Sequence, residues 1–126
     1  MRILLDTHLM LWWLASDRRL PKQAERLITD SDNEVYVSAA SVWEIAIKSA
    51  LGRIEGDVTE IEAALEPSGL IQLPINGKHA VQVSKLPLYH QDPFDRMLVA
   101  QSLVEPMRLL THDRILERYG EMVILV

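Results

Sequence analysis

HQDPFDRMLVAQS, residues 90–102, combines the start of a helix, two carboxylates and a strongly apolar helix face. Proline is tolerated at the first position of a helix, where its missing N–H would have no partner, so Pro93 marks the helix start. Asp92 can accept hydrogen bonds from the free N–H groups of the first turn, which predicts an N-cap. Asp95 lies at the third helical position, where a carboxylate favours the positive end of the helix. Capping could therefore explain both acids, and the question is whether Asp95 has another role.

Short apolar segments alternate with helical patterns on both sides of this stretch. Five segments are predicted to be strands: Ile3–Leu5, Val35–Val37, Leu70–Leu73, Arg108–Thr111 and Met122–Val126. The other predicted helices are Leu9–Ala15, Pro21–Thr29, one that starts within Ser38–Ser41 and continues to about Leu51 or Gly52, Val58–Leu65, Lys78–Leu86 and Ile115–Tyr119. This alternation predicts a three-layer α/β/α domain with a mainly parallel sheet of about five strands.

The composition narrows the classes of protein. At 126 residues, with 48% hydrophobic and 25% charged residues, the chain fits one globular domain, residues 1–126. It has no cysteine, which excludes a disulfide framework, a thiolate zinc site and a cysteine nucleophile, and which agrees with a cytoplasmic location. We expect no membrane segment and no secretory signal, because Asp6 and His8 interrupt the first apolar run. The net charge of -5 argues against a nucleic-acid coating protein but allows a nuclease with a local acidic site.

Four acids that are distant in the sequence are expected to meet at one edge of the sheet. Asp6 and Asp113 each follow a predicted strand directly, and ligands gather at the carboxyl ends of parallel strands. Crossover helices run antiparallel to the strands, so Asp95 and, one turn into its helix, Glu44 lie at the same edge. Each acid alone also has an ordinary explanation as a cap, a turn residue or, for Glu44 with Lys48, a surface ion pair.

Their convergence is what indicates a metal site. Neighbouring carboxylates raise one another's pKa, and a divalent cation relieves this repulsion. Oxygen ligands suit Mg²⁺ or Mn²⁺, and such an ion can activate water and polarise a phosphodiester. Thr111 could orient a carboxylate or a water molecule, and Arg96 could contact a phosphate. His8 and His112 flank two of the acids, but no pair of histidines has helical spacing, so we do not expect zinc.

Four motifs together resemble the PIN-domain ribonucleases, specifically the toxins of VapBC-type toxin–antitoxin pairs. They occur in order and cover nearly the whole chain: LLDTHLMLWWL (4–14), SAASVWEIAIKSALGRI (38–54), HQDPFDRMLVAQS (90–102) and LLTHD (109–113). The four acids of the family pattern fall on Asp6, Glu44, Asp95 and Asp113, and Thr111 matches the polar residue that commonly precedes the last of them. His8 departs from the small or hydroxyl residue that other branches often have two places after the first acid.

The resemblance implies a PIN-like fold and a Mg²⁺- or Mn²⁺-dependent endoribonuclease that cleaves RNA. It also implies a homodimer, and an antitoxin whose peptide crosses the groove of the toxin and keeps it inactive.

Two other functions fit parts of the sequence. A catalytically inactive PIN-like module acting through protein binding would explain the apolar LMLWWL segment and the negative charge. An aspartyl-phosphate receiver or phosphotransferase would also need an acid at a strand end. It would, however, be expected to have a second acid beside that position or a lysine after a later strand, and neither is present around Asp6 or after Asp113.

Overall fold

The computed structural model describes residues 1–126. Its five strands are β1 (Arg2–Leu5), β2 (Glu34–Ser38), β3 (Ile71–Leu73), β4 (Arg108–Thr111) and β5 (Val123–Leu125). Its α-helices are α1 (Thr7–Leu14), α2 (Lys22–Thr29), α3 (Ala39–Ala50), α4 (Val58–Leu65), α5 (Gly77–Val83) and α6 (Pro93–Val104), and one 3₁₀-helix, η1 (Arg114–Tyr119), precedes β5.

All strands form one sheet in the order β3-β2-β1-β4-β5, and every neighbouring pair is parallel. β1 lies at the centre, and its residues Ile3, Leu4 and Leu5 have no exposed surface. A strand buried on both faces is apolar throughout, which is why this short run could be recognised as a strand of a parallel sheet. The predicted parallel α/β sheet is confirmed.

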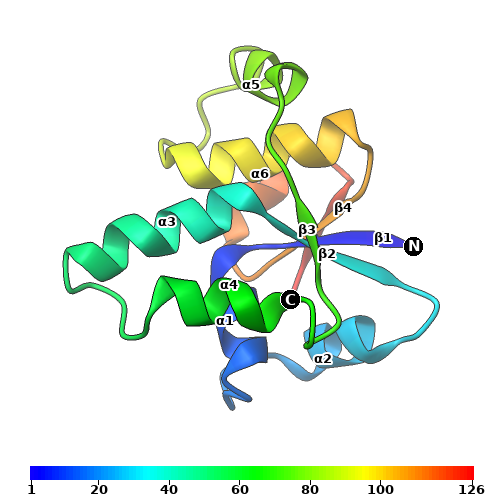
Figure 1. Cartoon of the computed structure of the whole chain (residues 1–126). Helices are drawn as coiled ribbons and strands as arrows, with labels where there is room; N and C mark the ends of the chain where they lie inside the picture. The colour runs from blue at the N-terminus through cyan, green and yellow to red at the C-terminus, as the bar shows by residue number, and fades with distance from the viewer.

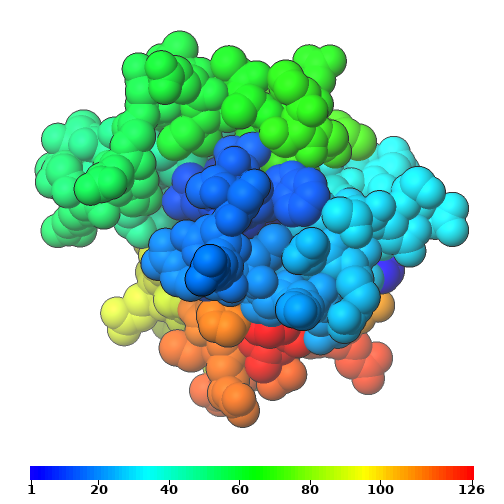
Figure 2. Space-filling model, turned by 90° about the horizontal axis from the view of Figure 1, so that it is seen from below, coloured from blue at the N-terminus to red at the C-terminus, as the bar shows by residue number.

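Helices cover both faces of the sheet (Figure 1). Side chains alternate across a strand, so Ile3 and Leu5 join the core beneath α1, α2 and α4, while Leu4 joins the core beneath α6 and η1. α3 contacts both α4 and α6. Figure 2 shows the face made by α1, α2 and α4, where α1 lies between the green α4 and the lighter blue α2.

The predicted elements are all present, and the differences are at their ends. The strand predicted from Leu70 begins one residue later, because the Leu70 N–H bonds back to the carbonyl of Leu65 at the end of α4. The helix predicted to reach Leu86 ends at Val83 and continues as turns with i to i+3 hydrogen bonds. No helix is both long enough and apolar enough to cross a membrane.

The order of the strands brings the first residues of three helices to the same edge of the sheet. α3 begins directly after β2, α1 one residue after β1, and η1 two residues after β4, all at the carboxyl ends of adjacent strands. From β1 the chain continues to β2 and β3 on one side of the central strand, and then returns to β4 and β5 on its other side. At such a reversal of strand order, parallel α/β sheets have a crevice in which they bind ligands.

Candidate functional site

Asp6, the first residue after β1, caps α1 and also joins β1 to β4. Its Oδ1 accepts from the backbone N–H of Leu9 at 2.8 Å. Its Oδ2 accepts from the Thr111 hydroxyl at 2.6 Å and from the backbone N–H of His112 at 3.1 Å. The residue is only 5% exposed. Capping is therefore one of two tasks of this carboxylate, since it also fixes the two strand ends relative to each other.

Thr111, the last residue of β4, links Asp6 to Asp113. Its hydroxyl donates to Asp6 and accepts from the backbone N–H of Asp113 at 3.0 Å. Asp113 caps η1 through Oδ1, which accepts from the N–H of Ile115 at 3.0 Å. Thr111 is completely buried. The predicted role of Thr111 in orienting a carboxylate agrees with these contacts.

Glu44 lies in α3 with its carboxylate buried beneath the start of α1. Oε1 accepts from the Thr7 hydroxyl at 2.7 Å, and Oε2 is paired with the Lys48 ammonium one helical turn later. The ion pair suggested by the spacing exists, but Glu44 is only 4% exposed, so it is not an ordinary surface pair. Lys48 and Thr7 offset the cost of burying this charge.

Asp95 points into the site because Asp92 does the capping. Asp92 Oδ1 accepts from the backbone N–H groups of Phe94 and Asp95 at 2.8 and 2.9 Å. The pKa of Asp95 is raised from 3.8 to about 7: burial is the largest cause, the negative charges of Asp92, Glu44 and Asp6 add to it, and His90 opposes the rise. Asp6 and Glu44 therefore act electrostatically on Asp95, as expected for acids gathered at one edge.

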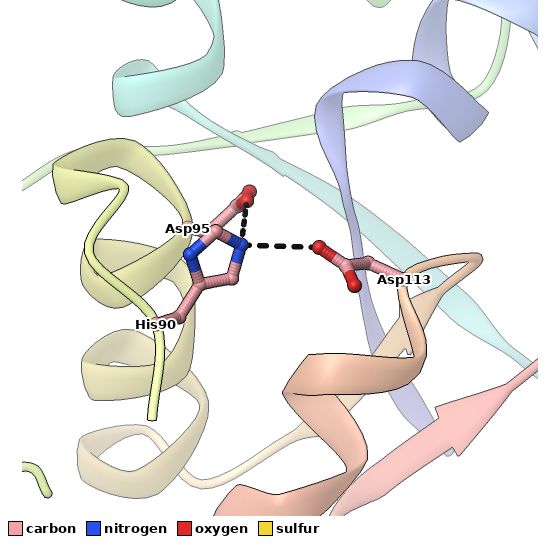
Figure 3. A group of neighbouring side chains, drawn as sticks. All are labelled: His90, Asp95 and Asp113. Carbon is pink, nitrogen blue, oxygen red and sulfur yellow. Dashed lines mark hydrogen bonds and ion pairs between the residues drawn. The ribbon is translucent and has the colours of Figure 1, made fainter. Parts of the chain in front are cut away.

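His90 lies between Asp95 and Asp113 (Figure 3). Its Nε2 is 3.2 Å from Asp95 Oδ2 and 3.1 Å from Asp113 Oδ2. The donor atoms of these three residues all lie within 4.8 Å of one another, a spacing that a metal ion could bridge. Asp6 and Glu44 are outside this group of three. The four predicted acids thus share one region but do not all meet at a single point.

A cavity of about 410 Å³ opens beside these acids. Its lining consists of Asp6, His8, Trp12, His112, Asp113 and Arg114. The Trp12 ring contacts the His112 ring edge-on, with 5.6 Å between centroids. A larger cavity of about 620 Å³ lies at the end of α1, where Asp17 and Glu25 are the only acids in its lining, so it holds no comparable group of acids.

The ligand atoms fit a hard divalent cation. Most are carboxylate oxygens, which Mg²⁺ and Mn²⁺ prefer, and the raised pKa of Asp95 shows that negative charge is concentrated there without full compensation. Asp6 and Asp113 each use an oxygen as a helix cap, yet a carboxylate has about four lone-pair positions and can accept further partners.

Comparison of the whole sequence with known families agrees with this arrangement. The profile of the family described as PIN domain matches residues 3–122. The chain belongs to the PIN domain family. The resemblance to PIN-domain proteins of the VapC type is therefore confirmed.

A named relative of this PIN domain covers most of the chain. It is 30% identical over 114 residues to Ribonuclease VapC22 of Mycobacterium tuberculosis, a match that spans 89% of this chain and 87% of that protein.

Solved structures share the fold at lower identity. VapBC2 from Rickettsia felis, bound to a DNA fragment from its promoter, matches with a TM-score of 0.71 and 15% identity over 100% of this chain and 98% of that chain. A toxin–antitoxin complex from Klebsiella pneumoniae matches with a TM-score of 0.68 and 16% identity over 97% and 95% of the two chains. These likenesses establish the fold of this PIN domain.

Arg96, predicted to contact a phosphate, bonds to loop carbonyls in the structure. Its Nη1 donates to the carbonyl of Pro87 at 2.9 Å and lies 3.3 Å from the Tyr119 hydroxyl, and its Nη2 donates to the carbonyl of Val83 at 3.1 Å. These bonds hold the segment between α5 and α6 against η1. The guanidinium therefore has structural partners in this arrangement, and its contact with a phosphate stays a prediction.

His90 is the site residue that sequence reasoning missed. It lies in an irregular segment, where neither helical nor strand periodicity indicates the direction of a side chain. The available signal was its position two residues before the N-cap Asp92, which allows its Nδ1 to accept from the Asp92 N–H at 3.2 Å.

Proposed function

We propose that this PIN domain is an endoribonuclease that uses Mg²⁺ or Mn²⁺ at a site formed by Asp6, Glu44, Asp95 and Asp113. The observation that carries the proposal is the placement of the four acids at one edge of the sheet, where burial, together with the neighbouring carboxylates, raises the pKa of Asp95 to about 7. A protein does not gain stability from such a group, so a bound cation is the reasonable explanation for it. The similarity to a protein named Ribonuclease VapC22 supports RNA as the substrate.

The residues of the chain prepare the site for this reaction. Thr111 fixes one oxygen of Asp6, Lys48 neutralises part of Glu44, and Asp92 satisfies the helix start so that the Asp95 carboxylate remains available. A divalent ion held by these carboxylates would lower the pKa of a water molecule and polarise a phosphodiester.

The cavity beside the acids is the proposed path of the RNA strand. Trp12 offers an aromatic ring on which an unstacked base can pack, and Arg114 offers a positive charge for a neighbouring phosphate. Single-stranded RNA is the form that can present a base in this way. We therefore propose an unpaired segment of RNA as the substrate.

The test is cleavage by the purified protein and by variants with a single carboxylate removed. Asp6→Ala and Asp95→Ala are expected to abolish Mg²⁺-dependent RNA cleavage and growth arrest in cells that express the protein. Asp32→Ala, at an exposed turn outside the site, is the control for loss of one negative charge and should cleave as the wild type does. Unchanged cleavage in both site variants, with folding confirmed by circular dichroism, would contradict the proposal.

We also propose that the protein acts as the toxin of a toxin–antitoxin pair in the cytoplasm and forms a homodimer. The matching structures named VapBC2 and toxin–antitoxin complex support the antitoxin as partner. An exposed apolar face supports protein contacts in general: Trp43 and Ile47, one turn apart on α3, and Leu51 at its C-cap are 59%, 38% and 62% exposed.

The same exposed face keeps one alternative open, a catalytically inactive PIN-like module that acts only through protein binding. Measurements of Mn²⁺ binding and RNA cleavage distinguish the ribonuclease from the inactive module. Antitoxin-free protein that neither binds Mn²⁺ nor cuts RNA would favour the inactive module, whereas metal binding together with cleavage would exclude it.

A further inference from the structure

The position of His90 is set by main-chain contacts that do not involve the acids. Its backbone N–H donates to the Tyr119 hydroxyl at 3.0 Å, and Tyr119 in turn donates to the carbonyl of Pro87 at 3.0 Å. The Asp92 N–H donates to the imidazole Nδ1 at 3.2 Å. The ring is therefore held in place from its own loop, and its Nε2 faces Asp95 and Asp113 as a consequence (Figure 3).

The contact with Asp92 also decides which nitrogen of a neutral ring carries the proton. Because Nδ1 accepts a hydrogen bond, it has a lone pair there, and the proton must be on Nε2. Nε2 then donates to the Asp113 oxygen at 3.1 Å, and the Asp95 oxygen lies 3.2 Å from the same nitrogen, within ion-pair distance. A nitrogen that carries a proton cannot also bind a metal ion.

We propose that His90 is a positioning residue that holds Asp95 and Asp113 together in the metal-free protein and competes with the divalent ion for their oxygens. The N–H group reduces the electrostatic repulsion between the two carboxylates, as a bound cation also would. A cation shared by Asp95 and Asp113 would compete with this N–H group for the lone pairs of the two oxygens that face His90, and its positive charge would oppose the positive end of the N–H dipole. His90 thus lowers the affinity of the site for metal and keeps the site assembled before metal arrives.

This inference rests on the proposed metal-dependent function and predicts the direction of a change in metal affinity. Removal of a competing donor strengthens binding, whereas removal of a metal ligand weakens it. The effect of losing one hydrogen bond to a charged group corresponds to an affinity change of roughly 10- to 150-fold. Metal binding can be measured without RNA and without catalysis.

The experiment is titration of the purified metal-free protein with Mn²⁺, with free Mn²⁺ measured by electron paramagnetic resonance. His90→Ala is expected to bind Mn²⁺ roughly 10- to 150-fold more tightly than the wild type. His90→Gln, whose amide N–H can reach the place of Nε2–H, should return the affinity toward the wild-type value. Gln23→Ala is the control, because Gln23 is exposed on α2 outside the site, and it should leave the affinity unchanged.

A second variant covers the case in which His90→Ala does not fold. His90→Asn places its amide near Nδ1 and has no donor at the position of Nε2, so it should also bind Mn²⁺ more tightly. Weaker binding by either variant would identify His90 as a metal ligand and overturn the inference, and unchanged binding would overturn it as well. If the wild type itself bound no Mn²⁺, both the proposed metal site and the inference would be wrong. If the wild type bound Mn²⁺ and the His90 variants did not bind it more tightly, only the inference would be wrong.

Discussion

Replacement of Asp95 by asparagine is expected to stabilise the metal-free protein at neutral and alkaline pH. The pKa of Asp95 is raised from 3.8 to about 7, so the folded protein binds this proton more tightly than the unfolded chain does. The free energy of unfolding of the wild type therefore decreases as the pH rises through this interval. Asparagine cannot ionise, so the Asp95→Asn variant is not subject to this loss.

The size of the effect follows from the two pKa values. Each pKa unit corresponds to about 1.4 kcal/mol, which gives an upper limit of about 4 kcal/mol above pH 7. The Asp95 side chain keeps 22% of its surface exposed, so solvent screens part of the repulsion. We expect a measured stabilisation of about 2 kcal/mol at pH 8, falling to nearly zero at pH 4.

The assay is urea denaturation of wild type and Asp95→Asn between pH 4 and pH 8 in the presence of a chelator. Asp32→Asn makes the same change of charge at an exposed turn and serves as control. A difference in stability that did not change with pH, or a variant less stable than the wild type at pH 8, would refute the reasoning. Addition of Mg²⁺ should remove much of the difference, since a bound ion stabilises the wild type through mass action.

Three other substitutions test separate parts of the site. Thr111→Val removes the hydroxyl that donates to Asp6 at 2.6 Å, and should lower the free energy of unfolding by about 1–3 kcal/mol in urea denaturation; no loss would mean that Thr111 does not position Asp6. Trp12→Leu keeps an apolar side chain but removes the aromatic ring. Loss of base stacking, about 1–3 kcal/mol, should raise KM for single-stranded RNA and leave kcat little changed. An unchanged KM would exclude Trp12 as a base contact. Trp43→Ser should weaken self-association in sedimentation experiments, because Trp43 is 59% exposed on α3; an unaltered dimer would place the interface elsewhere.

The fold could be predicted well because its signals are local. Apolar runs such as Ile3–Leu5 mark buried strands, and the Asp92-Pro93 pair marks a helix start that the structure has at the same residue. The ends of elements were harder, because they depend on single hydrogen bonds such as that from Leu70 N–H to the Leu65 carbonyl.

The topology was enough to predict that the acids lie at one edge of the sheet, but it could not predict which groups each acid contacts. Residues after parallel strands share an edge, which placed Asp6 and Asp113 correctly at the carboxyl ends of β1 and β4. The position of His90 and the occupation of Arg96 by loop carbonyls depend on how an irregular segment folds against η1. No periodicity in the sequence encodes that arrangement, so these two residues could be assigned only from the structure.

The most direct test of the central claim compares Mg²⁺-dependent RNA cleavage by Asp92→Asn and Asp95→Asn. Asparagine can still cap α6 at position 92, so this variant should keep most of the wild-type activity. Asp95→Asn keeps the fold but lacks the carboxylate proposed to bind metal, and its activity should fall by about 100-fold or more. Equal losses in the two variants, with both folded, would contradict the separation of the structural Asp92 from the metal-binding Asp95.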